Sequence, residues 1–164
     1  LAHLASHSQW SALHAALLTE SVREDGPGVA WARGWAAEVA EQEFDRWADA
    51  MDLDVEGLNE EQKQAFEASK RTVVRAICRG SLVVDEDGLA VYTPQRSGEI
   101  DPLTFHERTG ATLMAADSVK GSNAMIKKMY AILADLTRQN ATVFSKLKGT
   151  DIKVCEALFA LLMG

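Results

Sequence analysis

Apolar side chains recur at helical spacing through the first fifty residues of the chain, and a break rich in glycine interrupts them. Between residues 29 and 51 the apolar positions return every three to five residues, as is typical of an amphipathic helix; they are Trp31, Trp35, Val39, Phe44 and Trp47. A leucine stripe in residues 1–24 predicts an earlier helix, and Asp25-Gly26-Pro27-Gly28 separates the two. We therefore expect residues 1–40 to form a helical N-terminal arm and residues 41–164 to form a helical domain.

The pattern changes to that of strands between residues 81 and 107. Apolar runs at 82–84 and 89–92 flank the turn Asp85-Glu86-Asp87-Gly88, in which Gly88 supplies the positive φ that such a turn needs. Residues 103–107 are a candidate third strand, because two strands alone are only marginally stable. The predicted fold class is thus mainly α: a helical domain with a small β-hairpin, a minor α+β component, around residues 81–107.

Further helices are expected on both sides of the hairpin. Asn59 is the expected cap of one that ends at Gly80, and a short helix follows Thr109. A longer helix capped by Ser122 is predicted to turn its apolar side chains inward; they are Met125, Ile126, Met129, Ile132, Leu133 and Leu136. The last helix, with Thr150 as its expected cap, is apolar on several sides, which predicts burial in a core or contact with a partner.

Charged residues are distributed unevenly along the chain, and the net negative charge argues against some classes of binding protein. The net charge is −7, with 3 Lys/Arg and 13 Asp/Glu in residues 1–61 against 14 and 11 in residues 62–164. An acidic chain is a poor general binder of nucleic acid, which needs a basic face, and of an anionic membrane surface. The simplest interpretation of the acidic N-terminal face is that it is a solvated surface.

No group of residues has the layout of a metal centre. His3 and His7 are spaced i,i+4 but lack a third ligand at suitable spacing. The stretch from Asp52 imitates the start of a calcium loop, yet its twelfth position is Lys63, where a bidentate carboxylate is required. We expect no metal and no cofactor.

The chain also lacks the pattern of an active site. His106 and Glu107 are neighbours in a predicted strand and therefore point to opposite faces. Cys78 and Cys155 lie in helical patterns and are expected to be buried free thiols. No run approaches the roughly 20 apolar residues that a membrane span requires. We expect a soluble intracellular protein that is not an enzyme.

Residues from about 40 to 164 resemble the tail assembly chaperones of tailed phages and prophages. The motifs that carry the resemblance are Glu43-Phe-Asp-Arg-Trp47, the helix 70–79, the hairpin from Gly80 to Pro94, Leu103-Thr-Phe-His-Glu-Arg-Thr-Gly110, Leu113-Met-Ala-Ala-Asp117, residues 129–137, Phe144-Ser-Lys-Leu147 and Asp151-Ile-Lys-Val-Cys155. Related chaperones often carry an Arg-Arg-Pro-like turn where this chain has residues 106–109 without a proline. The resemblance implies a cytoplasmic protein of the bacterial host that binds the tape measure protein and tail tube subunits during tail morphogenesis.

Apolar breadth beyond the needs of one small core indicates a protein-binding surface. As a hypothesis we assign to it residues of three helices: Trp31, Trp35, Met125, Met129, Phe159 and Leu162. Core packing is the competing interpretation of the tryptophans and methionines. A structural tail or head–tail protein retained in the virion is the alternative function, and self-association into an oligomer is a further expectation.

Overall fold

The computed structural model describes the backbone of residues 27–53, 55–117, 119–120 and 124–164. The chain divides into two compact units, Leu1–Ala36 and Ala37–Gly164. Side chains are described from residue 36 onward except at 54, 116, 118 and 121–123, so Trp31 and Trp35 lie outside the described side chains.

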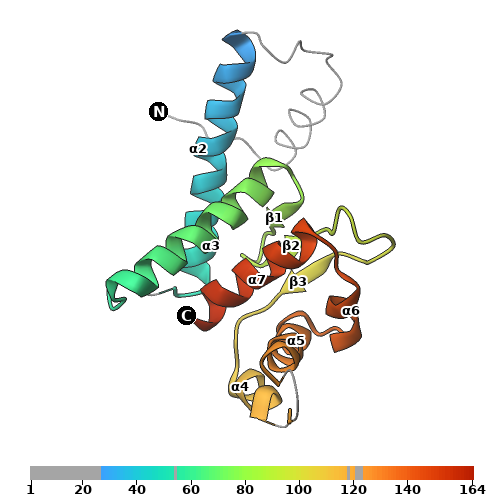
Figure 1. Ribbon diagram of the computed structural model, residues 1–164. Coiled ribbons are helices and arrows are strands. Elements are labelled where there is room, and N and C mark those ends of the chain that lie inside the picture. Colours follow the sequence, from blue (N-terminus) through green and yellow to red (C-terminus); the bar gives the residue numbers. More distant parts are fainter. Residues whose placement is uncertain (1–26, 54, 118, 121–123) are drawn as a thin grey trace. The chain divides into compact units, whose positions relative to one another are not determined.

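The fold is mainly α with a small antiparallel sheet, which confirms the predicted fold class (Figure 1). The described residues form six helices: α2 (Pro27–Ala50), α3 (Glu60–Cys78), α4 (Gly110–Asp117), α5 (Ala124–Thr137), α6 (Ala141–Lys146) and α7 (Thr150–Met163). Their three strands are β1 (Leu82–Val84), β2 (Ala90–Tyr92) and β3 (Leu103–Phe105).

Local signals fix both ends of α3. Asn59 caps α3 through a capping box, in which its side chain accepts from the Gln62 amide at 2.9 Å and the Gln62 side chain accepts from the Asn59 amide at 3.0 Å. Gly80, at φ 69°, follows the end of this helix. The predicted cap of α7 was wrong, because Thr150 is the first helical residue and the N-cap is Gly149, which makes no side-chain cap bond.

The sheet has the order β1-β2-β3, and the predicted third strand is present. Residue 89 lies outside the strands, since pairing starts with Val84 opposite Ala90 and ends with Leu82 opposite Tyr92. The turn between β1 and β2 requires a glycine at Gly88 for two reasons: its φ is 79°, and an added Cβ would lie 2.9 Å from the Cβ of Ala50.

Helices and sheet share one core. α3 packs on α7 and on β1, whereas α5 packs on β3 and α7. The largest fully buried side chains include Phe44 and Trp47 of α2, so core packing explains these two aromatic residues. Arg46, between them, faces the edge of the sheet and donates to the carbonyl oxygens of Val84 at 2.9 Å and Asp85 at 3.2 Å. The motif Glu43–Trp47 therefore anchors α2 to the hairpin.

Candidate protein-binding surface

Exposed apolar side chains gather on two neighbouring helices. Among the described residues six large hydrophobic side chains are exposed, and four of them lie on α4 and α5. Their exposed fractions are 54% for Leu113, 73% for Met114, 84% for Met125 and 52% for Ile126. We call these four residues the α4–α5 surface. Such a concentration is unusual, since exposed hydrophobic residues scattered singly are the norm for a soluble domain.

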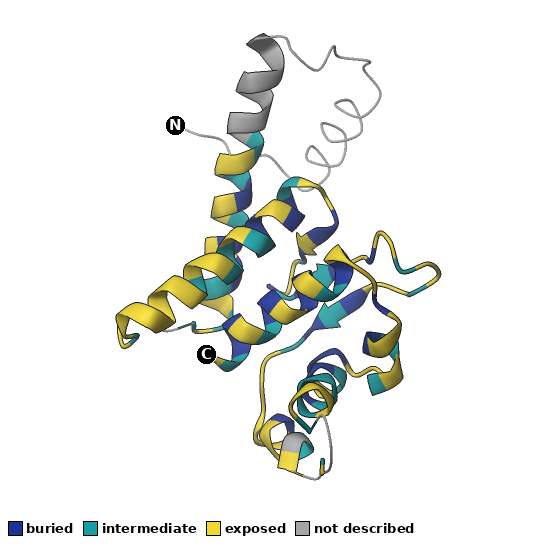
Figure 2. Cartoon of the chain, viewed as in Figure 1, coloured by how far each residue is buried: buried dark blue, intermediate teal, exposed yellow. Residues whose placement is uncertain are grey.

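Thr112 sets the orientation of α4. Its side chain is fully buried and donates a hydrogen bond of 2.6 Å to Asp135 Oδ2 on α5, while the Thr109 amide donates to Thr112 Oγ1 at 2.9 Å. Successive residues of a helix are about 100° apart, so the face that holds Thr112 against α5 turns Leu113 and Met114 away from it. Figure 2 shows this mixture of buried and exposed positions along α4.

The first turn of α5 extends beyond the core. Ile132, Leu133 and Leu136 are buried in its second half, and Met129 is half-buried between the two parts. The prediction that Met125 and Ile126 point inward was therefore wrong. The apolar pattern continues along the whole helix, but the sheet and α7 cover only its later turns.

Basic residues lie close in sequence to the residues of the α4–α5 surface. Residues 108–128 contain four basic side chains and one acidic side chain, a net charge of +3; the basic ones are Arg108, Lys120, Lys127 and Lys128. None of these four forms an ion pair with a residue that the structure describes. Exposed apolar side chains with basic residues nearby in the sequence suit a partner that is apolar and acidic.

The remaining proposed binding residues lie elsewhere. Phe159 is partly buried against the core, and Leu162 is buried with 4% of its surface exposed. Seven residues of α7 are buried, so the core accounts for the apolar breadth of this helix (Figure 2). Of the described candidates, only Met125 belongs to the α4–α5 surface. Sequence reasoning missed Leu113 and Ile126, although adjacent apolar residues on a short helix cannot all face one core.

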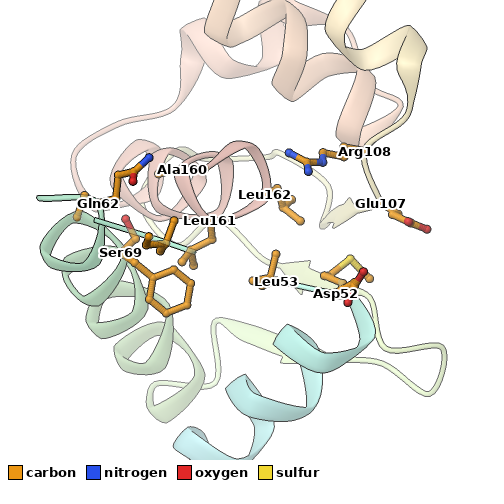
Figure 3. Close-up of a pocket in the computed structure, with 14 residues that line it drawn as sticks. Asp52, Leu53, Gln62, Ser69, Glu107, Arg108, Ala160, Leu161 and Leu162 are labelled. Carbon is orange, nitrogen blue, oxygen red and sulfur yellow. The ribbon is translucent and has the colours of Figure 1, made fainter. Parts of the chain in front are cut away.

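A groove lies between the end of α7, the start of α3 and the chain before α4. It has a volume of about 280 Å³, and Leu53 and Leu162 face each other across it (Figure 3). Asp52, Glu107 and Arg108 supply charge at its margin, but neither histidine nor cysteine is among the residues that line it. The groove does contain Ser69 and two carboxylates, but no hydrogen bond between described residues joins Ser69 to Asp52 or Glu107.

The two cysteines are not activated as nucleophiles. Burial raises the pKa of Cys155 to about 12, and burial together with Glu41 raises the pKa of Cys78, so both thiols stay protonated at neutral pH. Within the described part of the chain, no group of three or more His, Cys, Asp or Glu side chains is placed to hold a metal ion.

The most concentrated polar contacts surround the buried carboxylate of Asp151. Its Oδ1 accepts from the Tyr92 hydroxyl at 2.7 Å and the Gln95 amide at 2.9 Å; its Oδ2 accepts from the Arg96 amide at 2.8 Å and the Ser97 hydroxyl at 2.6 Å. We call these five residues the Asp151 junction. Burial by itself raises the pKa of Asp151, but the four hydrogen bonds outweigh it and hold the pKa below its usual value.

The Asp151 junction is structural. The carboxylate has all its strong acceptor positions occupied, so none is left for a substrate. It ties the first turn of α7 to the chain that follows β2, and Ser97 extends the link by accepting from the Lys148 amide at 2.8 Å. Asp151 also raises the pKa of the Tyr92 hydroxyl, second to burial, which keeps that group protonated as a donor.

No described helix combines the length and the apolar composition needed to span a bilayer. Comparisons with protein-family models, with curated protein sequences and with solved structures find no match to this chain.

Proposed function

We propose that this protein is a tail assembly chaperone of a tailed phage or prophage. In the cytoplasm of the bacterial host it binds the tape measure protein and tail tube subunits during tail morphogenesis, and it catalyses no reaction. The observation that carries the proposal is the α4–α5 surface, where four large apolar side chains are more than half exposed. The motifs that resemble the chaperone family are the reason for proposing a role in phage tail assembly.

The chemistry of the α4–α5 surface suits a helical client. An amphipathic helix presents apolar residues at i, i+3, i+4 and i+7, and two adjacent helices can receive such a stripe. Met114 and Met125 are unbranched and polarisable, so they adapt to apolar side chains of different shape. A binding site of this kind fits many similar segments along a long helical client.

The small size of the surface favours reversible binding. Stable protein–protein interfaces bury about 1,200–2,000 Å² in total. Four side chains supply only a small part of such an area. Each contact is therefore weak, and many copies along one client bind firmly only through multivalency. Weak individual contacts allow the chaperone to leave when tail tube subunits cover the tape measure protein.

The test is binding of fragments of the tape measure protein and of the tail tube protein encoded in the same genome. We expect at least one labelled fragment to bind in fluorescence anisotropy. The double variant Met114→Ser, Met125→Ser is expected to bind at least about 100-fold more weakly, since each buried methionine contributes on the order of 1.5–3 kcal/mol and each 1.4 kcal/mol corresponds to about tenfold in affinity. Val83→Ser is the matched control, because Val83 is 43% exposed on β1, away from α4 and α5.

Absence of binding by every fragment, or equal affinity of the double variant, would contradict the proposal. The alternative is a structural tail or head–tail protein, and quantitative mass spectrometry of purified virions distinguishes it. A chaperone is depleted from virions, whereas a structural protein is retained at high copy number.

A further inference from the structure

The groove between α3, α7 and the chain before α4 has charges of both signs beside apolar side chains. Its apolar residues include Leu53, Phe66 and Leu162. Asp52 and Arg108 also line it, and Figure 3 shows Arg108 on the side of Leu162 and Asp52 on the side of Leu53. An apolar site with a few charged groups at its margin is typical of a site for a small molecule.

The position of Asp52 is set by the way in which α2 ends. The Leu53 amide donates to the Ala48 carbonyl at 3.0 Å and the Asp52 amide to the Asp49 carbonyl at 3.2 Å, which is the pattern of a Schellman motif. The residue after the helix cap in this motif takes a left-handed conformation, and here it is Asp52, at φ 51°. The motif therefore holds Asp52 and its neighbour Leu53 in place at the groove.

Local preferences do not explain a carboxylate at position 52. Glycine is the usual residue there, because a side chain costs energy at positive φ. A negative charge is also unfavourable at the C-terminal end of a helix, where the helix dipole is negative. The last turn of α2 contains no basic residue that could offset it. Departures of this kind from local preference are expected at functional sites.

Arg108 is the counterpart of Asp52 at the start of α4. Only Thr109 separates it from Gly110, the first residue of this helix. A positive charge is unfavourable there, because the N-terminal end of a helix is already positive. Asp52 and Arg108 are both exposed, and neither forms an ion pair with the other or with a further described residue. Each can therefore pair with a charged group of a ligand.

The size of the groove and its opposite wall restrict the ligand. Its volume of about 280 Å³ lies just below the range of roughly 300–1,000 Å³ that is typical of ligand pockets, so the ligand is small. On the α3 wall the polar residues, Gln62 and Ser69, are uncharged. Oε1 of Gln62 already accepts from the Asn59 amide. Charged groups of a ligand are therefore expected on the side of Asp52 and Arg108.

We propose that this groove binds a free amino acid with an apolar side chain. The guanidinium of Arg108 donates to the ligand carboxylate, and the carboxylate of Asp52 accepts from the ligand ammonium. The ligand side chain lies against Leu53, Phe66 and Leu162. A zwitterion satisfies both unpaired charges, whereas an anion or a cation satisfies only one. This site goes beyond the proposed function, because it needs no client.

The test is titration of the isotope-labelled full chain with L-leucine, followed by heteronuclear NMR. We expect saturable shifts of amide signals from groove residues, with a dissociation constant on the order of 0.1–1 mM, because a ligand of so few atoms reaches only limited affinity. Glycine, which lacks an apolar side chain, should bind at least about tenfold more weakly. No client is present, so failure of this test leaves the chaperone proposal standing.

Each charge is tested with a variant and a matched ligand. Asp52→Asn keeps a residue that tolerates the left-handed conformation. This variant and Arg108→Gln should each weaken L-leucine binding by about fivefold, as expected for ion pairs at exposed positions. N-acetyl-L-leucine has no ammonium group, so Asp52→Asn should not weaken its binding. L-leucine amide has no carboxylate, so Arg108→Gln should not weaken its binding.

Glu107→Gln is the matched control, because it removes another carboxylate that lines the groove. Figure 3 shows the Glu107 side chain directed away from Arg108, so we expect its loss to change the affinity for L-leucine by less than about twofold. Absence of saturable shifts, or equal affinity of the original chain and both charge variants, would overturn the proposal. So would an equal loss in Glu107→Gln, or a loss that is the same for all three leucine ligands, since lost ion pairs would then not explain it.

Discussion

The Asp151 junction buries a charged group, whereas the α4–α5 surface exposes apolar groups. At the junction a fully buried carboxylate has four donors within 2.6–2.9 Å. On α4 and α5 four large apolar side chains are in contact with water, and α4 is fixed to α5 by the buried side chain of Thr112. The hydrogen bonds of the first region stabilise the fold. The second leaves apolar area uncovered.

The largest expected effect comes from breaking the junction. Asp151→Ala removes the acceptor of two hydroxyl and two amide donors, and we expect a loss of about 3–5 kcal/mol in the free energy of unfolding, since each unsatisfied buried donor costs on the order of 1–3 kcal/mol. Urea unfolding followed by tryptophan fluorescence measures it. Asp101→Ala, at an exposed carboxylate, is the control and should change stability by no more than about 0.5 kcal/mol.

A loss below about 1 kcal/mol for Asp151→Ala would show that water replaces the lost acceptor, and the junction would then be no more stabilising than an average hydrogen bond. The variant Asp151→Asn retains one acceptor oxygen and should fall between the original chain and Asp151→Ala.

The second prediction uses pH on the same region. The folded pKa of Asp151 lies below its ordinary value of 3.8, so its carboxylate stabilises the fold above that value, and the stabilisation is lost as pH falls through the folded pKa. We expect the difference in melting temperature between the original chain and Asp151→Asn to be constant from pH 7 to 5 and to shrink below about pH 4. A difference that does not change with pH would contradict the assignment of the ionised form.

The smallest expected effect concerns the attachment of α4. Thr112→Val removes the hydrogen bond to Asp135 and should lower global stability by about 1 kcal/mol. Asp135 is exposed, so water can solvate its freed oxygen. We expect amide exchange within residues 110–117 to become faster while the sheet keeps its protection, because α4 packs chiefly on α5.

Thr104→Val, a substitution on the half-buried middle position of β3, serves as the control for removal of a threonine hydroxyl. Faster exchange throughout α5 and the sheet in Thr112→Val would show that α4 is part of the cooperative core. The proposed division between a stable region and a binding region would then be incorrect.

Local signals explain why much of the fold was predictable. Asn59, Gly80 and Gly88 act through hydrogen bonds and dihedral angles within a few residues, and each ends or begins an element where the sequence predicts it. The two apolar runs 82–84 and 90–92 likewise predict a hairpin, because the short turn between them sets the register in which the strands pair. The fold class therefore followed from periodicity and turn chemistry.

The candidate site was less predictable, because exposure depends on contacts between distant parts of the chain. Met125 and Leu133 occupy similar positions in one apolar pattern, yet 84% of the first is exposed and the second is fully buried. The difference arises because β3 and α7 cover only part of α5.

The sequence by itself determined the mainly helical fold, the hairpin and the separation of acidic and basic segments, since spacing, turn residues and charge are properties of a linear chain. Tertiary structure alone decided that Phe44, Trp47 and Leu162 belong to the core and that Met114 and Met125 face water. It also decided the role of Asp151, whose partners lie 54–59 residues away and meet it only when the sheet and α7 pack together. The physical reason is that a residue becomes buried, or finds its hydrogen-bond partners, only through contacts with other helices and strands. The sequence of one element therefore does not determine them.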